Sequence, residues 1–517
     1  MTSTNQKVSN GVKYEAVIGL EIHAELNTKT KMFCSSLNDP DEKHPNINIC
    51  PICMGHPGTL PTINEDAVKK VISTGLALGG DIAEFSQFDR KNYFYPDLPK
   101  GYQISQYEYP LVKGGMIGVA GRTIRITRIH LEEDTGRLIH DKSSQATLVD
   151  FNRAGIPLME LVTEPDIRTG EEVRLFGEAL QRILRYVGAS DADMEKGQMR
   201  VEVNISLRRS TQIPTRINAD TISENPRLDQ RESAPLGTKV EVKNINSFKF
   251  AADAVEFEIK RQSEILDRGE KVVQETRGWN EHKGESFSQR AKESAHDYRY
   301  FPEPDLPPLN ISRDFVASLR AALPELPQAK QERFIREYGL EHGIAEILVR
   351  EKHLADYFEA AISEAKQHDT ETPEKPRRNL AKTIAALITG ELLRLMREVV
   401  AEIRDIHITP ENMGELADMI AEDKVSNLAA KQILAEMFAS GEDPSDIAER
   451  LGLWQMSGAT DIEDIARHII KENPAALEDY KKGKTASLQF LMGQVMKESR
   501  GTANPKIVQE VLKKLLG

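Results

Sequence analysis

The sequence has 517 residues, 39% of them hydrophobic and 29% charged, which is typical of a globular protein of about three domains. No apolar run approaches the roughly 20 residues that span a bilayer, and no targeting signal is visible at the N-terminus. The formal net charge of −13 argues against indiscriminate nucleic-acid binding, although a local basic surface could still attract a polyanion. We therefore expect a cytoplasmic protein that does not enter a membrane.

Strands dominate the predicted structure of the first 300 residues. Apolar and polar side chains alternate in the segments 17–26, 123–132, 200–208 and 239–243. Strands with one polar face are typical of antiparallel sheets. Between them the spacing of apolar residues predicts amphipathic helices at 171–187 and 248–268. The first part of the chain is thus predicted to combine an antiparallel sheet with helices.

Helical patterning becomes almost continuous after residue 308, interrupted by a predicted loop at 367–379. The predicted fold class is therefore α+β, with a sheet domain at 1–300, an all-α helical domain at 301–423 and a helical tail at 424–517. The end of this tail, 481–517, holds eight Lys or Arg and two Glu, a formal charge of +6. Such a surface can bind a phosphate backbone by releasing counterions, or it can contact the acidic remainder of the chain.

Candidate metal ligands lie on the polar faces of two predicted strands. Glu21 and His23 are two residues apart and share one face, as do His130 and Glu132 on a second strand. Glu160 lies in an apolar run, where a lone buried carboxylate would be costly. Carboxylates with an imidazole suit a hard divalent ion such as Mg²⁺ or Mn²⁺. The alternative is an acidic strand face exposed to water.

Cations and aromatic rings are interleaved in the segment 88–110, which contains Arg90 and Lys91 among several tyrosines. Such a segment can hold phosphates and stack on bases, or it can be a structural loop whose tyrosines fill the edge of the core. The chain has no phosphate-binding glycine loop of the G-x-x-x-x-G-K-[ST] type. A phosphoryl-transfer site would therefore need metal-bound carboxylates and basic side chains.

The three cysteines form a partial zinc pattern. Cys34, Cys50 and Cys53 have the spacing C-x15-C-x2-C, which lacks a fourth ligand. The nearby candidates for that ligand are His44, His56 and Ser36. Structural zinc and a cluster of free thiols both fit this pattern.

Several long motifs resemble the B subunit of the glutamyl/aspartyl-tRNA amidotransferases. In chain order they are VIGLEIHAEL (17–26), CPICMGHPGTLP (50–61), FDRKNYFYPDLPKGYQISQ (88–106), RIHLEEDTGRLIH (128–140), DFNRAGIPLMELVTEPDIR (150–168), VEVKNINSF (240–248), QETRGWN (274–280), DYRYFPEPDLPP (297–308) and FLMGQVMKESRGTANP (490–505). The resemblance covers nearly the whole chain in the expected order. It implies a cradle-shaped α+β domain, then a helical domain, then a helical tail.

The resemblance also implies an activity, that of a carbon–nitrogen ligase with glutamine as amido donor. Members of this family use ATP to phosphorylate the side-chain carboxylate of Glu or Asp misacylated onto tRNA. Ammonia then displaces phosphate and leaves Gln-tRNA or Asn-tRNA. An amidase-type A subunit releases the ammonia from glutamine, and a small C subunit clasps the two larger subunits.

Site residues are implied by the same motifs. The family's Mg²⁺ ligands correspond to Glu21, His23, Glu132 and Glu160. We expect catalytic roles for Glu132 and Glu160, together with Arg90 and Lys91. The four metal-type ligands favour an enzyme over the alternative, a non-catalytic tRNA-binding scaffold for the amidase.

A zinc site is the one feature in which the sequence departs from the family pattern. Zinc-binding relatives have C-x-C before the C-x-x-C, whereas Ser36 stands here in place of the second cysteine. If Zn²⁺ is bound, we expect His44 to replace the missing ligand.

Overall fold

The computed structural model describes residues 13–141, 145–210, 237–291, 298–365, 375–455, 459–481, 483–499 and 501–517. The chain divides into two compact units, Met1–Leu326 and Pro327–Gly517. The predicted division into three domains at residues 300 and 423 stays a prediction. None of the described helices is long and apolar enough to cross a membrane.

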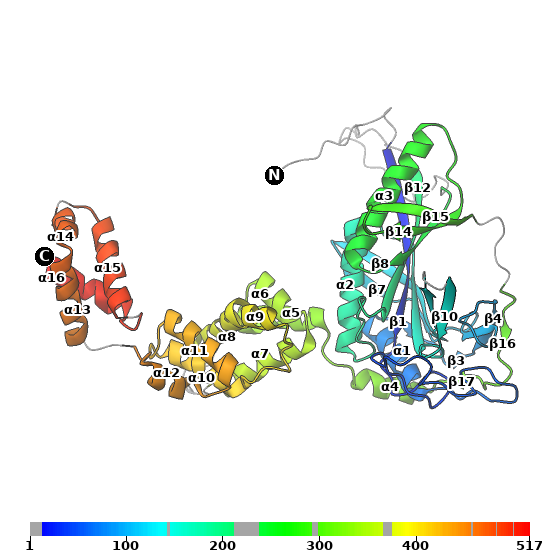
Figure 1. Ribbon diagram of the computed structural model, residues 1–517, viewed down its shortest axis with the longest axis horizontal. Coiled ribbons are helices and arrows are strands. Elements are labelled where there is room, and N and C mark those ends of the chain that lie inside the picture. The colour runs from blue at the N-terminus through cyan, green and yellow to red at the C-terminus, as the bar shows by residue number, and fades with distance from the viewer. Residues whose placement is uncertain are drawn as a thin grey trace, which may run out of the picture. The chain divides into compact units, whose positions relative to one another are not determined.

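A ten-stranded sheet forms the centre of the first unit (Figure 1). Its strands are β1 (Lys13–Glu25), β2 (Asp81–Ile82), β6 (Val112–Lys113), β7 (Met116–Val119), β8 (Arg122–Glu133), β11 (Pro157–Thr163), β12 (Met199–Ser210), β13 (Val240–Ile245), β14 (Glu275–Asn280) and β15 (Glu285–Ala291). The order is β15-β14-β13-β12-β1-β11-β8-β6-β2, and β7 also pairs with β8. All pairs are antiparallel except β13 with β14, which run parallel. The α+β prediction is confirmed, with one exception to the antiparallel pairing.

Helices cover one face of this sheet. They are α1 (Glu65–Ala77), α2 (Gly170–Tyr186) and α3 (Phe248–Asp267), and α4 (Arg313–Ala321) packs against α1. The apolar residues of β1, such as Ile18 and Leu20, form one core with Phe176 and Leu180 of α2. The hydroxyl of Ser247 accepts a hydrogen bond from the third residue of α3, which fixes the start of that helix. The opposite, polar face of β1 is left for other contacts.

Three small sheets complete the first unit, and one of them covers part of the polar face. They are β3 (Phe85–Ser86) with β17 (Leu309–Asn310), β9 (Arg137–Asp141) with β10 (Ala146–Asp150), and β4 (Asp89–Asn92) between β5 (Tyr102–Ser105) and β16 (Phe301–Pro302). The β5 strand packs on β8, where the Gln103 side chain donates to the carbonyl of Glu133 at 2.7 Å. The β16 strand brings the chain near residue 300 beside β4 (Figure 1).

The second unit is helical throughout its described residues. Its elements are α5 (Pro327–Tyr338), α6 (His342–Leu348), α7 (Lys352–Glu364), α8 (Lys375–Ala386), the π-helix η2 (Leu387–Leu392), α9 (Leu393–Val399), α10 (Pro410–Ala421), α11 (Asn427–Ser440), α12 (Pro444–Leu451), α13 (Ala459–Glu472), α14 (Pro474–Lys481), α15 (Ala486–Glu498) and α16 (Pro505–Leu516). One hydrophobic core extends from Phe334 to Leu453, and a second from Ile462 to Leu516.

The predicted loop at 367–379 is wrong at its C-terminal end. Residues 366–374 lie outside the described residues, but α8 already begins at Lys375. Pro376 suggested a loop, yet proline is well tolerated in the first turn of a helix because the amide groups there have no partner within the helix.

A close approach of α2 and α3 yields a stability prediction. A Cβ atom at Gly177 would lie 2.4 Å from the ring of Phe248. We expect Gly177→Ala to push the two helices apart and to lower the free energy of unfolding by about 1–3 kcal/mol. Gly343→Ala is the control, because Gly343 in α6 has open space and alanine favours a helix by up to about 1 kcal/mol. Calorimetry of both variants measures the effect, and equal melting temperatures would contradict the close packing.

Candidate active site

Five polar side chains from three neighbouring strands meet on the polar face of the sheet. The register places His23 of β1 opposite Glu160 of β11, and Glu160 opposite His130 of β8. Glu21 and Glu132 each lie two residues along their strands from these histidines, so they point to the same face. The sheet itself therefore assembles the site.

The distances confirm how close the side chains lie. The His23 Nε2 atom is 3.7 Å from a carboxylate oxygen of Glu21, 3.6 Å from one of Glu132 and 3.4 Å from one of Glu160. The structure thus brings the four expected metal ligands together. It adds His130, whose Nε2 lies 3.5 Å from Glu160 and 3.8 Å from Glu132. The strand pattern placed His130 with Glu132 among the candidate ligands, but the ligand set implied by the family motifs did not include it.

The carboxylates of this cluster are buried, so the polar faces of β8 and β11 are not open to water here. Glu132 is 2% exposed and Glu160 is 5% exposed. The Ser105 hydroxyl of β5 donates to Glu132 at 3.1 Å, and an Arg128 nitrogen lies 3.5 Å from Glu160. Buried carboxylates require compensating partners, because removing an unpaired charge from water is costly.

The imidazoles supply part of this compensation. Burial opposes the charge of Glu160, but His130, His23 and Lys91 outweigh it and hold the pKa of Glu160 well below its usual range. Burial likewise opposes the charge of Glu132, but a hydrogen bond with His130 and the nearby Lys91 keep the pKa of Glu132 lowered. Both groups are therefore ionised at neutral pH.

The pKa values of His23 and Glu21 are raised instead of lowered. Burial disfavours the imidazolium form, yet a hydrogen bond to Glu160 and the charges of Glu160 and Glu132 raise the pKa of His23 to about 9. Burial and the charges of Glu160 and Glu202 raise the pKa of Glu21 to about 7. A proton on His23 thus balances part of the negative charge while no cation is bound, and His23 must lose this proton before its Nε2 atom can act as a metal ligand.

The donor set fits a hard divalent cation. The ligand atoms of Glu21, His23 and Glu160 lie within 4.8 Å of one another, and so do those of His130, Glu132 and Glu160. Octahedral Mg²⁺ with bonds of about 2.1 Å requires neighbouring donors about 3 Å apart and opposite donors about 4 Å apart. The observed separations of 3.4–3.7 Å around His23 lie between these limits. Small side-chain shifts would therefore suffice to hold the ion.

The two expected basic residues lie on opposite faces of β4. Burial disfavours the charge of Lys91, but Glu132, Tyr300 and Glu160 outweigh this and raise the pKa of Lys91. Lys91 is therefore a charged group next to the carboxylates. Arg90 is instead held by a two-pronged ion pair with Glu303 at 2.7 and 2.8 Å and by Asp305 at 3.1 Å.

Comparison with known proteins identifies the family. Residues 16–317 match the GatB/GatE catalytic domain, and residues 371–516 match the GatB domain. The chain belongs to the GatB family. It is 46% identical over 98% of its length to the B subunit of the aspartyl/glutamyl-tRNA(Asn/Gln) amidotransferase of Dehalococcoides mccartyi, and the match covers 99% of that protein. The corresponding protein of Carboxydothermus hydrogenoformans is 45% identical, with 97% of this chain and 98% of that protein covered. Membership in the GatB family confirms the prediction of a tRNA-dependent amidotransferase subunit.

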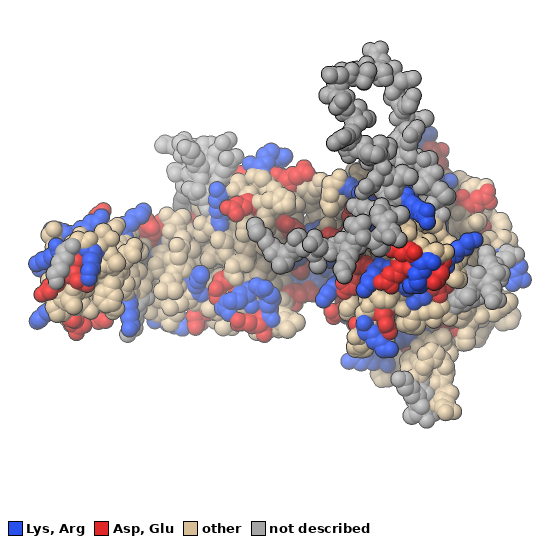
Figure 2. Space-filling view, turned by 90° about the horizontal axis from the view of Figure 1, so that it is seen from above, with Lys and Arg blue, Asp and Glu red and all other residues tan. Residues whose placement is uncertain are grey.

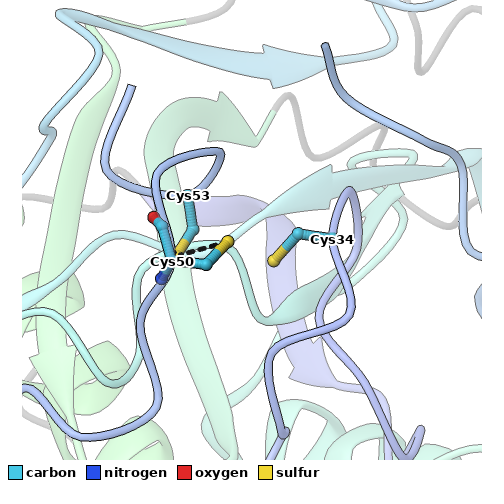
Figure 3. Close-up of side chains that lie close together, drawn as sticks. All are labelled: Cys34, Cys50 and Cys53. Carbon is cyan, nitrogen blue, oxygen red and sulfur yellow. Dashed lines mark hydrogen bonds between the residues drawn. The ribbon is translucent and has the colours of Figure 1, made fainter. Parts of the chain in front are cut away.

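The three cysteines of this GatB chain form a second cluster (Figure 3). Cys53 Sγ lies 3.8 Å from Cys50 Sγ and accepts the Cys50 N–H at 3.1 Å. The buried Lys31 ammonium lies 3.8 Å from the same sulfur. A hydrogen bond with Cys34 lowers the pKa of Cys53. Burial opposes this effect, but the Cys50 N–H and the charge of Lys31 also lower the pKa, which falls to about 5. Lys31 thus already balances one thiolate charge.

The expected fourth zinc ligand is wrong. The His44 side chain is 84% exposed and pairs with Glu42 at 3.0 Å, and among the described residues no His, Asp or Glu joins the three sulfurs. The spacing in the sequence shows how far His44 lies from the cysteines along the chain, but not where its side chain points. The cluster supplies three of the four ligands that a structural zinc site needs, and zinc binding stays a prediction.

Metal affinity provides a test of the carboxylate cluster. Glu160→Gln keeps the shape of the side chain but removes its charge, so we expect the affinity for Mn²⁺ to fall at least about tenfold. The matched control is Glu108→Gln, because Glu108 is exposed and lies outside the cluster. Titration of each purified variant with Mn²⁺, followed by electron paramagnetic resonance, measures free and bound ion. Unchanged affinity in Glu160→Gln would exclude Glu160 as a ligand.

Proposed function

We propose that this subunit uses ATP to phosphorylate the side-chain carboxylate of Glu or Asp esterified to tRNA. The carboxylate oxygen attacks the γ-phosphorus, and ADP leaves. Ammonia then attacks the acyl phosphate, so that a C–N bond replaces the C–O bond and phosphate is released. The product is Gln-tRNA or Asn-tRNA. The observation that carries this proposal is the cluster of Glu21, His23, Glu132 and Glu160, in which Glu132 and Glu160 are buried, in a chain of the GatB family.

Each part of the cluster has a role in this proposal. Glu132, Glu160, Glu21 and His23 hold Mg²⁺, and the ion, when bound, neutralises negative charge on the phosphates. The Lys91 ammonium lies close to these carboxylates and orients a phosphate oxygen. Arg90 is less suited to contact substrate, because Glu303 and Asp305 already occupy its guanidinium. We therefore assign Arg90 a role in positioning β4.

The proposal includes partners. We assign glutamine hydrolysis to an amidase-type A subunit and assembly to a small C subunit, as the family resemblance implies. All three cysteines of this chain gather in one cluster, so none is left for a cysteine-dependent glutaminase, and the sequence has no Gly-Gly-Ser-Ser amidase motif. The work of the complex on aminoacyl-tRNA would take place in the cytoplasm. The alternative of a non-catalytic scaffold does not account for two carboxylates buried beside two histidines.

Phosphorylation of the tRNA-bound carboxylate tests the catalytic proposal. We expect Glu132→Gln to reduce ADP formation stimulated by Glu-tRNA at least about a hundredfold, because a charged ligand of the ion is lost. The affinity for tRNA should change little. The assay uses the assembled complex with α-labelled ATP, whose label stays on the ADP, and Glu108→Gln is again the control. Near-normal ADP formation in Glu132→Gln would favour the scaffold.

The tail of the second unit is proposed to hold the tRNA body. The exposed lysines of its described residues include Lys497, Lys506 and Lys513. Figure 2 shows Lys and Arg side chains on these C-terminal helices, with Asp and Glu between them. Because α11 and α12 share the larger helical core, we place the tRNA contacts on α13 to α16. Contacts to the backbone would let one surface serve two tRNAs.

Lysine replacement tests this assignment. We expect the triple variant Lys497→Ala, Lys506→Ala, Lys513→Ala to raise the KM for aminoacyl-tRNA while kcat stays nearly unchanged. The salt dependence of tRNA binding should also flatten, by about 0.7–0.9 log units for each phosphate that the variant no longer neutralises. Lys431→Ala is the control, since Lys431 is exposed on α11. An unchanged salt slope in the triple variant would show that the tRNA is gripped elsewhere.

A further inference from the structure

A chain of five tyrosine rings runs from the side of the carboxylate cluster to the protein surface. Two segments far apart in the sequence supply the rings, because β16 pairs with β4. Neighbouring ring centroids are 4.3–6.2 Å apart, in the order Tyr95, Tyr93, Tyr298, Tyr300 and Tyr107. The Lys91 ammonium lies 5.2 Å from the centroid of Tyr298, and Lys91 pairs with Gln103 of β5, the strand whose Ser105 hydroxyl donates to Glu132.

Both ends of this chain are exposed, but Tyr95 contacts Tyr93 edge-on, whereas Tyr107 lies flat on Tyr300. Tyr107 also lies two residues beyond Ser105, whose hydroxyl donates to Glu132 at 3.1 Å, so this end of the chain lies near the carboxylates. Tyr107 stacks on Tyr300 with centroids 4.3 Å apart and an angle of 15° between the rings, yet it is 61% exposed.

Tyr107 is thus an aromatic ring fixed in place on one face and open on the other. Its backbone N–H donates to Asp89 at 3.0 Å, which holds the chain at this point. A tyrosine that only filled the edge of the core would bury most of its ring. An exposed ring stacked on another ring instead offers a platform on which a flat ligand can stack.

We infer that the outer face of Tyr107 stacks on the 3′-terminal base of the aminoacyl-tRNA. This inference rests on the proposed function. The amino acid is esterified to the terminal ribose, so the terminal base lies only one ribose and one amino acid from the carboxylate to be phosphorylated. Tyr107 lies two residues beyond Ser105, whose hydroxyl donates to Glu132. Stacking suits this task because it tolerates any base and any tRNA body.

ATP also carries an adenine, but the geometry favours the tRNA end. Small-molecule sites are concave and bury most of the ligand surface. The ring of Tyr107 lies open on the surface, where the end of a macromolecule can reach it. An exposed platform therefore fits a base delivered from outside better than an enclosed nucleotide.

The test uses the assembled complex and the variant Tyr107→Ala. Loss of one stacked base should raise the KM for Glu-tRNA about tenfold, with kcat and the KM for ATP nearly unchanged. Tyr107→Phe should behave like the natural chain, because a phenyl ring still stacks. Phe94→Ala is the matched control, since Phe94 is 80% exposed in the same segment and has no ring contact in the chain of five.

A direct readout comes from tRNA with 2-aminopurine in place of its terminal adenine. Binding to the natural complex should quench its fluorescence, and binding to Tyr107→Ala should leave it bright. A rise in the KM for ATP alone would overturn the inference and assign the platform to the nucleotide. An unchanged KM for Glu-tRNA in Tyr107→Ala would also overturn it. If the natural complex makes no amidated tRNA at all, the proposed function itself fails, which is a separate result.

Discussion

Two carboxylates buried side by side are the constraint that shapes this site. Glu132 and Glu160 lie within 4.8 Å of each other, and both are almost fully removed from water. Two negative charges so placed repel each other, and the protein can keep them ionised only with positive partners close by. His23 and Lys91 supply this positive charge, and His130 contributes a hydrogen bond to Glu132. Each of these three side chains comes from a different strand. The strand pairings that position them therefore also offset the cost of burying the two carboxylates.

The strand register and the small β4–β5–β16 sheet together bring compensating groups to the two buried carboxylates. Antiparallel pairing of β1, β11 and β8 sets His23, Glu160 and His130 in one row. The β5 strand covers the row and contributes the Ser105 hydroxyl, while β4 carries Lys91 to it. A site held by backbone pairing is rigid before any ligand arrives, and such preorganised charges cost no reorganisation during a reaction. The excess of carboxylate over imidazole then favours a cation.

The sequence predicted the faces of the strands but not their surroundings. Alternation placed Glu21 with His23 and His130 with Glu132, because side chains on a strand repeat every two residues. It could not show that β5 buries these faces, since that contact joins residues about 30 positions apart. The same limit explains His130, which only the neighbouring strand brings to Glu160. The parallel pairing of β13 with β14 leaves no local signal in either segment.

Segments outside regular patterns were harder to predict. The composition of 88–110 gives Arg90 and Lys91 the same expected role, because the mixture of cations and aromatic residues hides the short strand β4. Adjacent residues of a strand point to opposite faces, so recognition of β4 would have separated them. The prediction of His44 as a zinc ligand is wrong for a similar reason, because spacing along a loop does not determine where a side chain points. The long motifs correctly grouped Glu21, His23, Glu132 and Glu160, because such motifs carry information about distant neighbours that a local pattern lacks, while their role as metal ligands stays a prediction.

The distribution of charge explains how an acidic protein can work on RNA. The net charge of −13 would repel a polyanion, but the basic 481–517 end makes the remainder of the chain more negative still. Most of that negative charge, a formal −13, lies in residues 327–480, whereas residues 1–326 carry only −6. RNA would therefore be attracted to the 481–517 end and repelled by the acidic helices before it. In the candidate active site, His23 and Lys91 offset part of the carboxylate charge, so the site repels a phosphate-bearing substrate less than its glutamates alone would.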